Sequence, residues 1–143
     1  MSDQNYSNHA QLVTGYHKVG FALFLLILIG SIRFLWTSVG TDNLELSLLL
    51  LAIAITIILM GIYARIFALK AQDRAIRAEE NLRHFVLHGS LLPSELTMRQ
   101  IIGLRFASDD EFRSLAADAA QKGTSEKEIK QAIKNWKSDT DRV

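Results

Sequence analysis

The residues of this chain best suited to chemistry are His84 and His88, which lie four positions apart in a stretch that favours a helix. That spacing puts both imidazoles on one helix face, where they can share a metal ion. Two further histidines, His9 and His17, lie near the N-terminus. Because no H-E-x-x-H motif and no carboxylate at a fitting spacing accompanies them, we interpret His84 and His88 as partly exposed helical side chains and predict no metal site.

Other catalytic patterns are also missing from the sequence. It has no Gly-rich phosphate loop and no nucleophile elbow. It has no cysteine, which excludes disulfides and Cys-ligated zinc or iron–sulfur sites. We therefore predict no catalytic residue, no cofactor and no enzymatic activity.

Two apolar runs, residues 19–35 and 46–64, dominate the first half of the 143-residue chain. Each is about as long as the roughly 17 to 25 helical residues that cross a hydrocarbon layer about 30 Å thick. A polar N-terminus and the lack of an A-x-A-like site argue against a cleaved signal peptide. The runs therefore predict two membrane-spanning helices, with the lipid bilayer as the first partner.

Aromatic and basic residues flank both runs, as is typical at the level of the lipid headgroups. The predicted membrane-interface residues are Tyr16, Lys18, Arg33, Trp36, Tyr63 and Arg65. Only a short loop with turn formers such as Gly40 separates the runs, so we expect an antiparallel hairpin. Basic residues follow the second run and are missing from the loop, which predicts that both termini are cytoplasmic, with Arg33 the one residue against this orientation.

A single long helix is predicted from about Leu44 to His88, because no glycine or proline interrupts the sequence between the second run and Gly89. Steps of four and three along it select one face of mostly small residues at the spacing of a coiled-coil seam. This seam consists of Gly61, Ala64, Ala68, Ala71, Ala75, Ala78, Leu82 and Phe85. Small residues let helices approach closely in a membrane, so we predict a homo-oligomer interface, the alternative being that alanine merely favours helix formation.

The opposite face of the long helix carries an apolar stripe that gives way to Asp73, Glu80 and Arg83. Charges three or four positions apart, such as Glu80 and Arg83, can pair on a helix surface. We interpret this face as solvated and assign no site to it.

Three short amphipathic helices are predicted after the long one, over residues 98–106, 109–122 and 126–137, and Ser94 or Thr97 can begin the first of them. Ser108 and Glu111 form a capping box at the start of the second helix, and Ser125 and Glu128 form one at the start of the third. Gly123 ends the second helix. An apolar side of the third helix includes Trp136, which we interpret as a core anchor.

The overall prediction is an all-α chain in four segments. These are an N-terminal amphipathic docking segment (1–18), a transmembrane helical hairpin (19–69), a cytoplasmic extension of its second helix (70–90) and a C-terminal helical domain (91–143). The docking segment is rich in amides and tyrosine, which suits hydrogen bonds to headgroups or to protein, and a disordered tail is the alternative. The residues after Arg65 have a net charge of only +1, so a nucleic-acid partner is not expected.

Four motifs give the chain a resemblance to a known family. They are Gln4-Asn5-Tyr6-x-Asn8-His9, the segment from Ala68 to Glu80, Arg105-Phe106-Ala107-Ser108-Asp109, and Ile129-Lys130-x-x-Ile133-Lys134-x-Trp136. Together they resemble small bacterial two-pass membrane proteins of unknown function. The resemblance implies a bacterial inner-membrane location but no activity. Two functions remain open: a scaffold that forms a homo-oligomer, and an accessory subunit that docks on another membrane protein.

Overall fold

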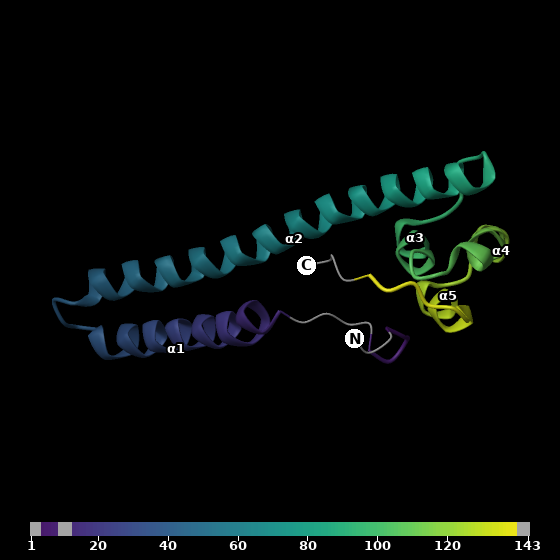
Figure 1. The fold of residues 1–143 in the computed structure, drawn as a ribbon. Helices are drawn as coiled ribbons and strands as arrows, with labels where there is room; N and C mark the ends of the chain where they lie inside the picture. Colours follow the sequence, from purple (N-terminus) through teal and green to yellow (C-terminus); the bar gives the residue numbers. More distant parts are fainter. Residues whose placement is uncertain (1–3, 9–12, 140–143) are drawn as a thin grey trace. The chain divides into compact units, whose positions relative to one another are not determined.

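The computed structural model describes residues 4–8 and 13–139, which contain helices and no strand (Figure 1). In chain order the elements are a π-helix η1 (Gly15–Gly20), α1 (Phe21–Ser38), α2 (Leu44–His88), α3 (Met98–Leu104), α4 (Asp109–Lys122) and α5 (Glu126–Ala132). The predicted all-α class is confirmed for this part of the chain. Two compact units are present, one of residues 13–68 and one of residues 4–8 with 69–139.

The first unit contains the two apolar segments. η1 and α1 form one helical stretch of 24 residues, and α2 is 45 residues long. By length and composition both helices could cross a membrane. In the first helix, no part of the most apolar window is buried within the chain. In α2, only 11% of the corresponding window is buried. The segments are thus not the covered core of this chain, and most of their large apolar side chains are exposed.

A close contact at Gly61 joins the two segments, and α1 lies beside the first part of α2 (Figure 1). The Tyr16 hydroxyl donates a hydrogen bond of 3.2 Å to the Gly61 carbonyl. A Cβ atom at Gly61 would lie 3.3 Å from the Phe24 ring, so the missing side chain is what allows this approach. The five-residue connection after Ser38 turns at Gly40, whose φ of 79° favours glycine.

The core of the second unit forms where α3, α4 and α5 pack with the end of α2. Its most buried large side chains are Leu104, Phe106 and Phe112, and α2 contributes Ile76. α2 ends at His88 as predicted, because Gly89 takes a φ of 72°. α3 and α5 approach closely at Gly103, where an added Cβ would lie 3.2 Å from a backbone oxygen of α5.

Two of the expected helix starts are confirmed, and both have capping boxes. Of Ser94 and Thr97, which both precede α3, the structure uses Thr97, whose side chain accepts from the Gln100 amide nitrogen. Ser125 accepts from the Glu128 amide in the same way at α5, and the Glu128 carboxylate accepts the Ser125 backbone N–H. That backbone hydrogen bond lowers the pKa of Glu128. α4 ends at Gly123, as predicted.

The predicted length of the last helix is wrong. α5 ends at Ala132, and Ile133 is extended instead of helical. Trp136 pairs with Ala107 in an isolated antiparallel bridge, and the Lys137 N–H donates to the Phe106 carbonyl at 2.8 Å. Backbone hydrogen bonds to a distant segment therefore replace those of the helix. Trp136 still packs against the core, as expected, with its ring 5.1 Å from that of Phe106.

The predicted capping box at Ser108 is also wrong. Ser108 occupies the N-cap position, but its side chain accepts no hydrogen bond from the α4 backbone. Its hydroxyl instead donates to the Glu111 carboxylate at 3.4 Å. That carboxylate accepts the backbone N–H groups of Lys134 and Asn135, at 3.1 and 2.9 Å. Glu111 thus accepts backbone N–H groups from the far end of the chain, while the Ser108 backbone N–H donates to the Asn135 carbonyl instead of to Glu111.

Candidate functional site: a polar junction at Arg83

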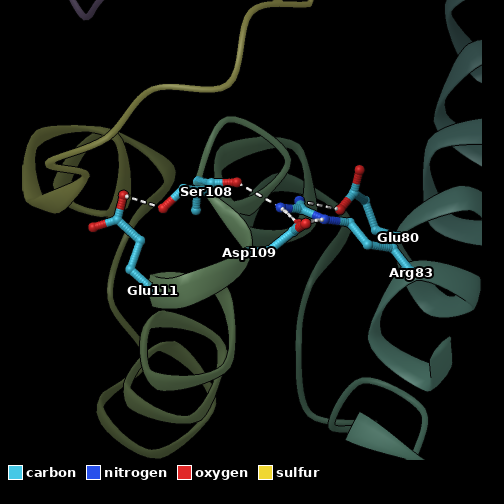
Figure 2. A network of polar contacts seen from close by, with 6 residues as sticks. Glu80, Arg83, Ser108, Asp109 and Glu111 are labelled. Carbon is cyan, nitrogen blue, oxygen red and sulfur yellow. Dashed lines mark hydrogen bonds and ion pairs between the residues drawn. The ribbon is translucent and has the colours of Figure 1, made fainter. Parts of the chain in front are cut away.

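The best organised polar cluster of the second unit surrounds Arg83, near the end of α2 (Figure 2). Its Nε and one terminal nitrogen donate to one oxygen of Asp109, at 2.8 and 2.6 Å. The same terminal nitrogen reaches the Ala107 carbonyl at 2.7 Å, and the other one pairs with Glu80 at 3.0 Å. We name this set of Glu80, Arg83, Ala107 and Asp109 the Arg83 junction.

Local sequence explains how each partner is positioned. Asp109 is the first residue of α4, where a carboxylate also interacts favourably with the helix dipole. Ala107 ends the turn between α3 and α4, so its carbonyl is not used by a helix. Phe112 lies almost one turn into α4, and the Arg83 guanidinium carbon lies 4.2 Å from its ring centre. One arginine thus binds a carboxylate, a carbonyl and a ring of the α4 region.

The junction combines buried and exposed charges. The Arg83 and Glu80 side chains are 11% and 10% exposed, whereas that of Asp109 is 60% exposed. The hydrogen bond from Arg83 lowers the pKa of Asp109, because the guanidinium stabilises the charged carboxylate. A buried cation between two carboxylates fixes α4 against α2, and we see structural attachment as what this arrangement can do.

Our interpretation of this helix face as solvated is wrong. The expected pairing of Glu80 with Arg83 is present, but both side chains lie beneath the C-terminal helices, as does Ile76. Sequence analysis missed the junction because Asp109 lies 26 positions from Arg83. The available signal was the apolar Ile76, which lies one turn before Glu80 and indicates a buried face instead of a solvated one.

The two histidines lie beside the junction. His84 is only 5% exposed, so its prediction as partly exposed is wrong, and its Nδ1 lies 2.6 Å from the Ser90 carbonyl. His88 is half-buried, with its ring 4.9 Å from that of His84. Burial and the neighbouring His84 lower the pKa of His88. Among the residues that the structure describes, no three His, Asp or Glu side chains are placed to hold a metal ion; His9 lies outside them.

A second ionic contact lies at the C-terminal end of this unit, and a hydrogen bond connects the same place to Gln4. Arg105, which follows α3, forms an ion pair with Asp139. The Asp139 backbone N–H donates to the Gln4 side chain at 2.7 Å. Gln4 of the predicted docking segment therefore contacts the C-terminal segment of its own chain, while Gln11, another amide of that segment, lies outside the described residues.

The predicted seam lies on the uncovered side of α2. Gly61 contacts α1 of the same chain, and all the later seam residues, from Ala64 to Phe85, are exposed. Leu82 and Phe85 are 63% and 53% exposed. Position 78 lies two residues from the covered positions 76 and 80, about 200° around the helix, so seam and junction occupy opposite faces.

The predicted membrane-interface residues fall at the two ends of the first unit. Tyr16, Lys18, Tyr63 and Arg65 lie at one end, where the Arg65 guanidinium carbon is 5.9 Å from the Tyr16 ring centre. Arg33 and Trp36 lie at the other end, beside the loop, and Trp36 is 83% exposed. Aromatic and basic side chains thus lie at both ends of this unit.

Comparison with known proteins gives the family. The chain belongs to a family of unknown function (DUF6526), whose model matches residues 1–143. No curated protein and no solved structure matches it. The assignment agrees with the resemblance to a family of unknown function and adds no activity, so the function must be argued from the chain itself.

Proposed function

We propose that this protein is a non-enzymatic scaffold of the bacterial inner membrane that self-associates through the seam on α2. The observation that carries the proposal is the exposure of the seam from Ala64 to Phe85, on the face of α2 opposite the Arg83 junction. A row of small residues leaves room for a second backbone, and van der Waals contact then favours association within lipid. A second copy of the chain, presenting the same seam, would cover it.

The membrane part of the proposal uses the two long apolar helices. α1 with η1, and the first part of α2, would form an antiparallel transmembrane hairpin, and the rest of α2 would extend into the cytoplasm. Lys18, Arg65 and the basic residues that follow Arg65 favour a cytoplasmic location of both termini. The motif resemblance to bacterial two-pass proteins supports the inner membrane as the location.

Thiol labelling in intact cells tests this topology. A cysteine replacing the exposed Thr41 in the loop should react with a membrane-impermeant reagent, and one replacing the exposed Ser138 should not. After cell lysis both should react. Labelling of Ser138→Cys from outside, or recovery of the chain in the soluble fraction, would refute the proposed membrane arrangement.

Seam substitutions test the self-association. The combined change of Ala68→Leu and Ala75→Leu would force the backbones apart, at a cost of about 1 to 3 kcal/mol per site. The mass of the protein in detergent, measured by light scattering, should fall toward that of a monomer. Ala52→Leu is the matched control, because Ala52 is exposed on α2 but lies off the seam. An unchanged mass of the double variant would show that the seam reflects helix propensity alone.

An accessory subunit is the second candidate, and a specific surface favours it. Leu82, Phe85, Val86 and Leu91 are more than half exposed near the end of α2, in the segment that the proposed topology places beyond the bilayer. Such an apolar surface outside lipid is suited to cover by a protein. The same mass measurement separates the candidates: a monomer that purifies only with another membrane protein supports the accessory subunit.

A further inference from the structure

An apolar cavity of about 430 Å³ lies within the first unit, between η1 with α1 on one side and α2 on the other. Its volume is in the usual range of ligand pockets, roughly 300 to 1,000 Å³. Most of the lining is hydrocarbon or aromatic, including Phe21, Phe24 and Leu28 from α1 and Ile58 and Ile62 from α2. This lining matches an acyl chain and offers little to a polar ligand.

Polar groups line the cavity at one end only. Tyr16, His17 and Arg65 lie there, with the Arg65 guanidinium carbon 5.9 Å from the Tyr16 ring centre. Lys18 is exposed two positions after Tyr16. This end of the unit is therefore cationic.

The opposite charge is concentrated at the other end. The acidic residues between positions 13 and 68 are Asp42 and Glu45, in or next to the loop that joins α1 to α2. Both of these carboxylates therefore lie at the end of the unit away from Arg65. The unit combines an apolar cavity with an end that attracts negative charge.

We propose that the cavity binds one acyl chain of an anionic phospholipid, whose phosphate pairs with Arg65 beside the Tyr16 ring. Basic pockets between membrane helices on the cytoplasmic side are known to suit anionic headgroups. Tyr16 and Arg65 are also the residue types that occupy the headgroup level. The inference rests on the membrane placement in the proposed function, and of the seam residues it uses only Gly61, which faces α1 of the same chain.

Gly61 has a specific part in this site. Its carbonyl accepts the Tyr16 hydroxyl and so holds the polar end in place. Its missing side chain keeps the cavity open, since a Cβ atom there would lie 3.3 Å from the Phe24 ring. A large residue at this position should therefore exclude an acyl chain whatever its headgroup.

Native mass spectrometry of the full chain in detergent tests the proposal, with phosphatidylglycerol and phosphatidylcholine of identical acyl chains as probes. The wild type should retain more phosphatidylglycerol. Arg65→Gln should weaken phosphatidylglycerol binding about five-fold, as expected for the loss of one cation near a lipid phosphate, and weaken phosphatidylcholine binding less, because the choline cation offsets the charge of its phosphate. Arg33→Gln is the matched control at the other end of the unit and should change neither.

Gly61→Leu should reduce binding of both lipids, whereas Gly30→Leu should not, because an added Cβ at Gly30 meets nothing within 4 Å. Equal binding of the two lipids by the wild type, or equal effects of Arg65→Gln and Arg33→Gln, would overturn the inference. So would displacement of the lipid by glycerol 3-phosphate at matching concentration, because a free phosphate would then be the ligand. Failure of the proposed function gives a different result, namely a chain recovered in the soluble fraction or a mass unaffected by the seam variants.

Discussion

Replacement of Arg83 by alanine should release α4 from the end of α2. The variant loses the hydrogen bonds to Asp109 and Ala107, the ion pair with Glu80 and the contact with the Phe112 ring. It also leaves two buried groups without this partner, because Ala107 is fully buried and the Glu80 side chain is 10% exposed. Removing one partner of a buried ion pair typically costs about 3 to 5 kcal/mol.

The two sides of the same ion pair should differ in cost. Asp109→Ala removes a carboxylate that is 60% exposed, and Arg83 keeps Glu80 and the Ala107 carbonyl as partners. Solvent screens a pair of this kind, so we expect a loss of about 1 kcal/mol. Arg99→Ala is the control, since Arg99 is 80% exposed and lies 3.6 Å from Glu126, and it should cost less than about 1 kcal/mol.

Native-state proteolysis of the full chain in detergent measures these differences. When opening is fast relative to cleavage, the cleavage rate follows the population of the open form. A loss of about 3 kcal/mol corresponds to a rise of about 100-fold or more in cleavage within α4 for Arg83→Ala. Asp109→Ala should give a rise of only about five-fold. Equal rates for Arg83→Ala and Arg99→Ala would refute the view that the junction attaches α4 to α2.

Three further predictions concern the second unit. Thr97→Ala should lower the stability of this unit by about 1 kcal/mol, whereas Ser108→Ala should change that stability by less than about 0.5 kcal/mol. The reason is that the Thr97 side chain caps its helix and the Ser108 side chain does not. Chemical denaturation of both variants measures the difference. Trp136→Ala should lower the stability of this unit by about 2 to 3 kcal/mol, because the indole loses its contact with the core. Proteolytic cleavage of the last segment should then be faster. Unchanged cleavage together with loss of a bound partner would instead show that Trp136 is a docking contact. Burial and His84 lower the pKa of His88, so the unfolded chain takes up this proton first as the pH falls. The free energy of unfolding should therefore decrease below about pH 6.5 in the wild type, and less so in His88→Gln. Thermal unfolding measured across pH 5 to 8 compares the two proteins.

Elements whose limits are set by local sequence were predicted well. α2 runs from Leu44 to His88 because its interior lacks breakers beyond the second run and Gly89 readily takes a positive φ. Thr97 and Ser125 act as caps within four residues of their partners. In each case the deciding contact is short in sequence, so a pattern of neighbouring residues contains it.

Elements whose conformation depends on distant contacts were predicted poorly. No neighbouring residue in the sequence indicates that the N–H groups of Lys134 and Asn135 bind Glu111, which lies more than 20 positions away. These hydrogen bonds accompany the early end of α5. Arg83 poses the same difficulty, since its pairing with Glu80 is local and its pairing with Asp109 is not. A helical pattern reports propensity, and tertiary hydrogen bonds override it at these positions.

The position of the junction on α2 bears directly on the proposed oligomer. A helix that carries a domain on one face can pair with another helix only on the face that the domain leaves open. Since Ile76 and Glu80 are covered and Ala75, Ala78 and Leu82 are exposed, attachment and self-association would use separate residues of one helix. Arg83→Ala should then speed proteolysis of α4 without changing the mass in detergent, and the double seam variant should change the mass without speeding proteolysis. If either variant alters both quantities, the two faces are coupled, and the independence argued here from their separation around the helix is wrong.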